Sequence, residues 1–173
     1  KTSLLFAGAK TAPGVHALCQ TVNFHTESPF FPIHSFFIKV NEYLPKDIHI
    51  LSSEIVSDRF RHQIKRSLQN LFDRICTAPV QNIFTRAYTA NIPEIISESE
   101  VAAIRKAADS LVGVHDFRSL SGVKKKKGTV KEIFDISVSH SKETENDSFS
   151  LLTIKICAND FLYLMPEHII EFS

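Results

Sequence analysis

Hydrophobic and polar residues alternate in several stretches of the chain, and this is the pattern of half-buried β-strands. Residues 4–7, 17–25 and 48–56 show it in the first part of the chain. Later, KKKKGTVKEIFDISVSHS and SFSLLTIKICANDFLYLM show it on either side of the polar sequence KETEND. We predict a strand in each stretch, with the last two paired as an antiparallel hairpin.

Two helices are expected in the first half of the chain. The first lies between Pro32 and Pro45, because proline interrupts regular structure. The second starts at Ile64, within residues 58–76, where apolar residues recur at intervals of three and four. The same stretch is rich in arginine and lysine, so the exposed side of this helix would be basic.

The clearest helix is predicted over residues 97–113. Ser97 or Ser99 can cap its amino-terminal end, and acidic residues in its first turn complement the helix dipole. Gly113 is expected to end it.

The order of these elements predicts an α+β fold with a largely antiparallel sheet and flanking helices. Residues 1–76 are expected to form an amino-terminal lobe and residues 77–173 a carboxyl-terminal lobe. We expect a cleft between the two lobes.

Composition narrows the possible functions. The chain is 43% hydrophobic, as a globular protein requires, and its 20 basic residues almost balance its 19 acidic residues. Any nucleic-acid binding must therefore come from local basic patches. No apolar run reaches the roughly 18 residues of a membrane span, and the sequence has no signal-peptide pattern, so no membrane partner is expected.

The cysteines and histidines suggest neither a disulfide framework nor a metal site. Cys19, Cys76 and Cys157 are odd in number and far apart, which favours reduced, buried thiols and an intracellular location. The histidines have no spacing typical of metal ligands.

Four segments carry a family resemblance. AKTAPGVHA lies in the loop between the first two predicted strands, and VNEYLPKDIHI, AADSLVGVHDFRSL and ICANDFLYLM follow. In this order they resemble the motifs G-R-T-D-A-G-V-H-A, N-x-x-L-P-x-D-I, G-x-H-D-F-x-S and A-N-x-F-L-x-x-M of the TruA-type tRNA pseudouridine synthases. The resemblance covers nearly the whole chain. It implies that the family's opening strand and helix and its carboxyl-terminal helix are missing here.

The resemblance implies a TruA-like pseudouridine synthase fold and a cofactor-free isomerisation of uridine in RNA. A catalytic aspartate attacks or orients the uracil of a flipped nucleotide, a tyrosine packs against the base, and an arginine pairs with the aspartate. This chemistry needs an ionised carboxylate beside a cation.

This sequence departs from the family pattern at all three positions. Ala12 stands at the aspartate position, Leu71 at the tyrosine position and Glu167 at the arginine position. A methyl group is neither nucleophile nor base, and a glutamate repels an anion that an arginine would hold. We therefore predict no catalytic residues, which favours a protein that is not an enzyme.

RNA contacts are expected from basic residues and one histidine. Lys10 retains the positive charge of the family's loop arginine, and the four consecutive lysines form the densest charge run. The expected contacts are Lys10, His16, Arg59, Arg61, Lys65, Arg66, Lys124, Lys125, Lys126 and Lys127. His115 and Asp116 are interpreted as residues that stabilise the turn after the helix.

Three interpretations of function remain. The first is a non-catalytic RNA-binding protein with a structural role in a ribonucleoprotein such as an organellar ribosome. It implies tRNA or rRNA and other ribonucleoprotein subunits as partners, leaves dimerisation open, and favours a mitochondrial location with the natural amino terminus missing from the sequence.

The second interpretation is an active pseudouridine synthase whose carboxylate lies elsewhere, at Asp58, Asp73 or Asp160. The third is a protein–protein scaffold without RNA, which the phenylalanine-rich sequence PFFPIHSFF would suit.

Overall fold

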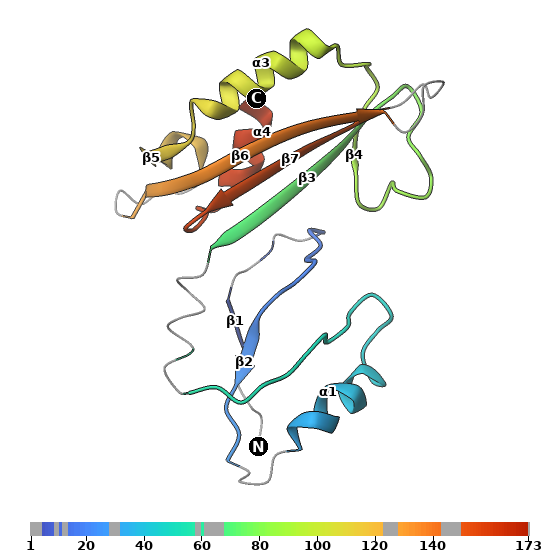
Figure 1. Ribbon diagram of the computed structural model, residues 1–173, viewed down its shortest axis with the longest axis vertical. Helices are drawn as coiled ribbons and strands as arrows, with labels where there is room; N and C mark the ends of the chain where they lie inside the picture. Colours follow the sequence, from blue (N-terminus) through green and yellow to red (C-terminus); the bar gives the residue numbers. More distant parts are fainter. Residues whose placement is uncertain are drawn as a thin grey trace. The chain divides into compact units, whose positions relative to one another are not determined.

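The computed structural model describes residues 5–8, 11, 14–27, 32–57, 60, 68–122, 128–142 and 150–172. The chain divides into two compact units, Lys1–Arg66 and Ser67–Ser173. The division thus comes after Arg66 rather than after residue 76. Figure 1 shows the elements of each unit coloured along the sequence.

The first unit contains a short hairpin and one helix. Strand β1 (Leu5–Ala7) pairs antiparallel with β2 (Val22–Phe24), and α1 (Ile33–Asn41) follows. The rings of Phe24 and Phe36 lie 5.5 Å apart and join β2 to α1. The two predicted strands are confirmed over shorter lengths, and the helix after Pro32 is confirmed.

The strand predicted over residues 48–56 is wrong. This segment is irregular, and the backbone of Ile50 bonds to a side chain rather than to a neighbouring strand. Asn41 accepts a hydrogen bond from the Ile50 amide (2.7 Å) and donates one to the Ile50 carbonyl (2.9 Å). Ser53 donates to the carbonyl of Ile33 at 3.0 Å. The alternation of apolar and polar residues therefore did not produce a strand here, because no strand among the described residues pairs with this segment.

The second unit is built on a five-stranded sheet with the order β4-β3-β7-β6-β5. Its strands are β3 (Gln69–Thr77), β4 (Ala90–Ile92), β5 (Gly113–Asp116), β6 (Val130–Lys142) and β7 (Ser150–Ala158). Only the β3–β4 pairing is parallel. The predicted antiparallel hairpin is confirmed as β6 and β7, and the fold is the α+β class expected.

Strand β3 corrects the helix predicted from Ile64 onward. Residues 69–77 pair along their whole length with β7, from Gln69 opposite Ala158 to Thr77 opposite Ser150. Their exposure alternates accordingly, with Leu71 and Ile75 more buried than the residues that precede them. Tertiary pairing here overrides a local helical spacing, and it places these residues in the second unit.

Helix α3 (Glu98–Asp109) confirms the strongest helix prediction. Ser97 forms the cap: its side chain accepts from the Glu100 amide, and its own amide donates to the Glu100 carboxylate at 2.7 Å. The helix ends at Asp109, earlier than predicted. Gly113 instead opens β5 with a φ of 112°, a conformation that favours glycine.

The chain after β7 does not continue as a strand. It turns through Leu164, whose φ is 59°, into helix α4 (Met165–Phe172). Met165 and Ile169 of this helix are almost completely buried in the core. Phe117 of the short 3₁₀ helix η1 (Phe117–Leu120) belongs to the same buried cluster. The four-residue spacing of Met165 and Ile169 puts both on one helix face.

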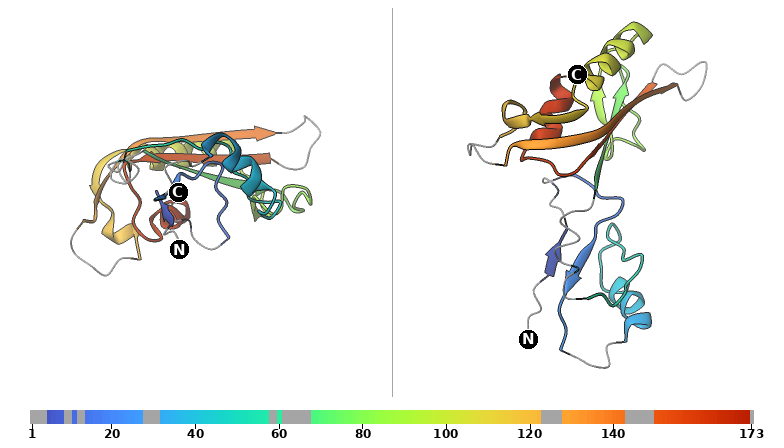
Figure 2. Two further views of the ribbon diagram at one scale, coloured as in Figure 1. Left: turned by 90° about the horizontal axis from the view of Figure 1, so that it is seen from below. Right: turned by 60° about the vertical axis from the view of Figure 1, so that its left-hand side comes forward.

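The core of the second unit lies between one face of the sheet and α3 and α4 (Figures 1 and 2). Ile154, Ile156 and Leu152 of the central strand β7 are almost completely buried there. Among the described residues, no helix is long and apolar enough to span a membrane. Cys76 is buried as expected, whereas Cys157 is half-buried and Cys19 is exposed.

Candidate functional site

The loop between β1 and β2 carries the first family motif. Its described part, Thr11 and residues 14–21, is irregular and exposed. Gly14 has a φ of 82°, and nothing lies within 4 Å of the position that a Cβ would occupy, so the turn requires glycine for its backbone rather than for space. His16 is exposed on the same loop.

Most of the predicted RNA-contacting residues, and one catalytic position, lie outside the described residues. These are Lys10, Ala12, Arg59, Arg61, Lys65, Arg66, Lys124, Lys125, Lys126 and Lys127. They remain predictions from the sequence.

Leu71, at the family's tyrosine position, lies in β3 on the helical side of the sheet. Its register partner is Ile156 of β7, and its side chain packs against the buried apolar cluster. Leu71 is therefore an apolar contact at the margin of the core. It offers no hydroxyl group and no aromatic ring to a bound base.

Two acidic residues, one on β3 and one on α4, interact electrostatically. Asp73 follows Leu71 on the same face of β3, and Glu167 is exposed in the first turn of α4. Burial raises the pKa of the Asp73 carboxyl, a backbone hydrogen bond at Arg74 opposes this, and the negative charge of Glu167 raises it further. Leu71 and Asp73 thus share one face of β3, and Glu167 adds negative charge to the surroundings of Asp73. The resemblance aligns Glu167 with the family's arginine.

Replacing Asp73 with asparagine is expected to stabilise the fold at neutral pH. The pKa of the Asp73 carboxyl is higher in the folded protein than in the unfolded chain, so the folded protein binds the carboxyl proton more tightly. At a pH above the folded pKa, the ionised Asp73 carboxylate therefore lowers the free energy of unfolding. The gain should be small, at most about 0.5 kcal/mol, since Asp73 is only half-buried. It should disappear as the pH falls through the folded pKa toward 3.8, the ordinary value.

Urea unfolding at pH 7.5 and at successively lower pH would measure this difference. Asp135→Asn, at an exposed position of β6, is the matched control. A destabilised Asp73→Asn variant at pH 7.5 would show that the ionised carboxylate makes a favourable contact instead.

A second carboxylate lies beside a cation. Lys131 of β6 donates to Asp160 at 2.5 Å, and the Gln69 amide lies 3.5 Å from the other oxygen of the same carboxylate. The Asp160 side chain is 48% exposed, so this ion pair is accessible from solvent. Of the three alternative carboxylates, Asp160 is the one that the structure pairs with a cation, while Asp58 lies outside the described residues.

His115 and Asp116 stabilise a turn, as the sequence suggested. Asp116 accepts a hydrogen bond from the Arg118 amide at 3.1 Å, and hydrogen bonds from Thr129 and this amide lower the pKa of its carboxyl. The His115 ring contacts Phe117 edge to face. The contacts of both residues thus stabilise the connection between β5 and η1.

A buried polar network was not anticipated from the sequence. His140 of β6 has one ring nitrogen 3.0 Å from the Glu98 carboxylate and the other 2.8 Å from Ser150 Oγ. Ser150 Oγ in turn lies 2.6 Å from Thr77 Oγ1. An acid, a histidine and a serine in this order resemble a hydrolytic triad. Ser150 and Thr77 are buried, however, so the network ties α3 to three strands and does not present a nucleophile to solvent.

The described residues contain no group of three or more histidine, cysteine, aspartate or glutamate side chains arranged to hold a metal ion.

The family described as tRNA pseudouridine synthase matches residues 107–170. This segment runs from the end of α3 through β5, β6 and β7 into α4, and it includes Asp160 and Glu167.

Three bacterial proteins are similar over almost the whole chain. The chain is 30% identical to tRNA pseudouridine synthase A 2 of Bacillus anthracis over 98% of its length, which is 65% of that protein. It is 31% identical to a tRNA pseudouridine synthase A 2 of Bacillus cereus, over 94% of the chain and 62% of the relative. It is 30% identical to tRNA pseudouridine synthase A of Thermoanaerobacter sp. (strain X514), over 96% and 64%. The chain thus spans slightly less than two thirds of the length of these relatives.

Proposed function

We propose that this chain, which belongs to the TruA-type tRNA pseudouridine synthase family, is an RNA-binding member that does not isomerise uridine. One observation carries the proposal. Glu167, which the resemblance aligns with the family's arginine, adds a negative charge that contributes, after burial, to the raised pKa of the half-buried Asp73 carboxyl.

The loss of catalysis follows from electrostatics. The family mechanism needs a cation that holds the catalytic carboxylate ionised. Glu167 and Asp73 together would oppose the ionisation of any carboxylate brought next to them, and Leu71 gives only apolar contact. Ala12 itself has no ionisable group. These features support a site in which the chemistry has been lost.

On this proposal the protein keeps the fold of an RNA-modifying enzyme for binding. A structural role in a ribonucleoprotein such as an organellar ribosome, with a mitochondrial location, is part of the same proposal. Purification of the protein from its native cells, with identification of the bound RNA and proteins, tests this role. Recovery without RNA would contradict it.

Replacement of Lys124, Lys125, Lys126 and Lys127 with alanine is expected to weaken RNA binding. Each lysine that contacts a phosphate releases counterions, so the slope of log affinity against log salt should flatten by up to about one unit per lost contact. Fluorescence anisotropy with a labelled tRNA at several salt concentrations measures this slope. A variant with the exposed Lys46 and Lys106 replaced by alanine is the control, and an equal slope in both variants would contradict the assignment.

A second candidate function is an active synthase that uses Asp160. The Lys131–Asp160 ion pair supplies a carboxylate beside a cation, as the chemistry requires. Formation of pseudouridine that is lost in Asp160→Asn would support this candidate over the first.

A further inference from the structure

The sheet of the second unit has a face opposite to that covered by α3 and α4. Because side chains alternate along a strand, the residues between the core positions of β3, β7 and β6 point to this second face. In the first row across the three strands, Lys155 of β7 lies opposite Phe72 of β3 and Ser137 of β6. In the second row, Thr153 lies opposite Arg74 and Ser139. We call the following residues the open face: Phe72, Arg74, Thr153, Lys155, Ser137 and Ser139.

An exposed aromatic ring lies in the first row of the open face. Phe72 is 49% exposed although it lies within a nine-residue strand that pairs along its whole length. The Lys155 Nζ lies 5.6 Å from the centroid of its ring, which is the distance of a cation–π contact. This pair leaves a large apolar surface in water with a positive charge directly beside it.

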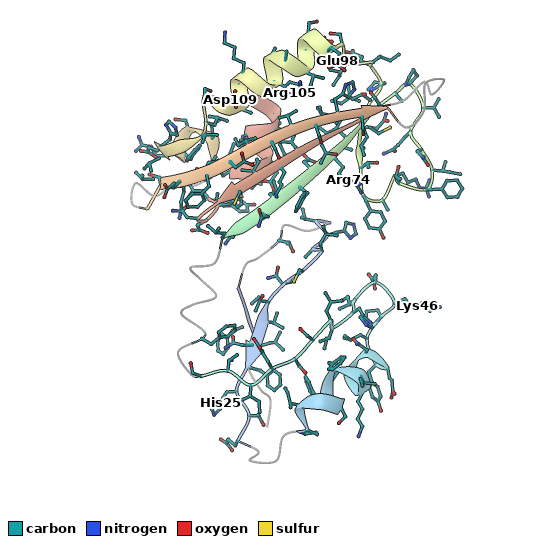
Figure 3. All side chains as sticks on the ribbon, viewed as in Figure 1. His25, Lys46, Arg74, Glu98, Arg105 and Asp109 are labelled. Atoms are coloured by element: carbon teal, nitrogen blue, oxygen red, sulfur yellow. The ribbon has the colours of Figure 1, made fainter. Side chains whose placement is uncertain are left out.

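The second row adds another cation and hydroxyl groups. Arg74 is exposed two residues after Phe72, opposite Thr153, and Ser139 continues the row on β6. Figure 3 shows Arg74 on β3, while Glu98, Arg105 and Asp109 lie on α3 at the covered side. Asp135, on the same face of β6, is exposed and acidic. The two cations lie on β3 and β7, and the acid lies on the neighbouring strand.

We propose that the open face binds single-stranded RNA, with a base stacked on Phe72 and phosphates held by Lys155 and Arg74. An aromatic platform flanked by cations is the arrangement that single strands recognise, because every base has a stacking face and every linkage carries a negative charge. The hydroxyls of Ser137, Ser139 and Thr153 can bond to sugar or phosphate oxygens. Leu151, which the register places on the same face of β7, is half-buried, so the surface of this face is aromatic, cationic and hydroxyl-bearing rather than aliphatic, which favours RNA over a protein partner. This inference rests on the proposed RNA binding and assigns a surface to it.

The experiment measures the affinity of the full chain for a fluorescein-labelled oligouridylate by anisotropy at several salt concentrations. Phe72→Ala should weaken binding about five- to tenfold or more, with an unchanged salt slope, since stacking is lost but no charge. Lys155→Glu should weaken binding and also lower the slope by about one unit. Phe72→Tyr should bind like the unmodified chain, because it keeps the ring.

Lys106→Glu is the matched control, since it makes the same charge change at an exposed position in the last turn of α3. It should alter affinity less than about twofold, because it lies away from the open face. If the unmodified chain binds but Phe72→Ala and Lys155→Glu behave like Lys106→Glu, the open face is not the site, and the proposed function stands. If the unmodified chain binds labelled tRNA but not the oligouridylate, the open face is not a single-strand site and the proposed function stands; if it binds neither RNA, both proposals fail. Thermal melting of each variant separates misfolding from loss of contact, and Lys155→Glu retains the test if Phe72→Ala is unstable.

Discussion

Incubation of this chain with uridine-containing tRNA or rRNA is expected to produce no pseudouridine, and Ala12→Asp alone should not restore it. Catalytic residues that act as a unit are strongly non-additive, so one restored member leaves the rate about 10⁴-fold or more below that of a functional enzyme. The resemblance aligns Glu167 with the arginine that pairs with this carboxylate in the family, so a restored aspartate would lack that cation.

Release of tritium from C5 of labelled uridine measures the reaction directly, because isomerisation breaks the bond between C5 and its tritium. A bacterial tRNA pseudouridine synthase A, assayed alongside, is the positive control. RNA binding by the same preparations shows that the variants are folded. Robust turnover by Ala12→Asp would mean that Leu71 and Glu167 are compatible with catalysis, and the proposed loss of function would be wrong. Turnover by the unmodified chain would direct attention to Asp160.

Truncation of Ile156 to alanine is expected to destabilise the second unit by about 2–5 kcal/mol. Ile156 is 0% exposed on the central strand β7, with Leu71 opposite it on β3 and Ile136 opposite it on β6. Deletion of its buried methyl and methylene groups removes contacts to both neighbouring strands and leaves a cavity that the paired backbones cannot close.

Urea unfolding followed by circular dichroism measures this loss. Val114→Ala, at a residue of β5 that is 62% exposed, should change the stability by at most about 0.5 kcal/mol. A loss below about 1 kcal/mol for Ile156→Ala would contradict a core centred on β7.

Asp73 and Glu167 connect the fold to the proposed function. Leu71 and Asp73 lie on the same face of β3 because strand side chains alternate, and the negative charge of Glu167 on α4 raises the pKa of Asp73. The sequence alone marked Leu71 and Glu167 as replaced residues. The electrostatic link between Asp73 and Glu167 became visible only in the tertiary structure.

The RNA-binding proposal draws on two different kinds of residue. The basic runs were identified from their density of charge, and they lie outside the described residues. The open face was not identified in this way, because Phe72, Arg74, Lys155 and Ser137 come from three strands and form no local motif. Only the register of β3, β7 and β6 brings them side by side.

Local sequence by itself determined the elements whose signals are local. The capping box at Ser97 and Glu100 marks the start of α3, and the long alternation on either side of a polar turn specifies the β6–β7 hairpin. The resemblance to the pseudouridine synthase family was also readable from the sequence, since collinear motifs do not require a structure. Tertiary structure decided the rest. Residues 69–77 became a strand, and residues 48–56 did not, because a strand needs a partner for its backbone hydrogen bonds, and that partner can lie anywhere in the chain.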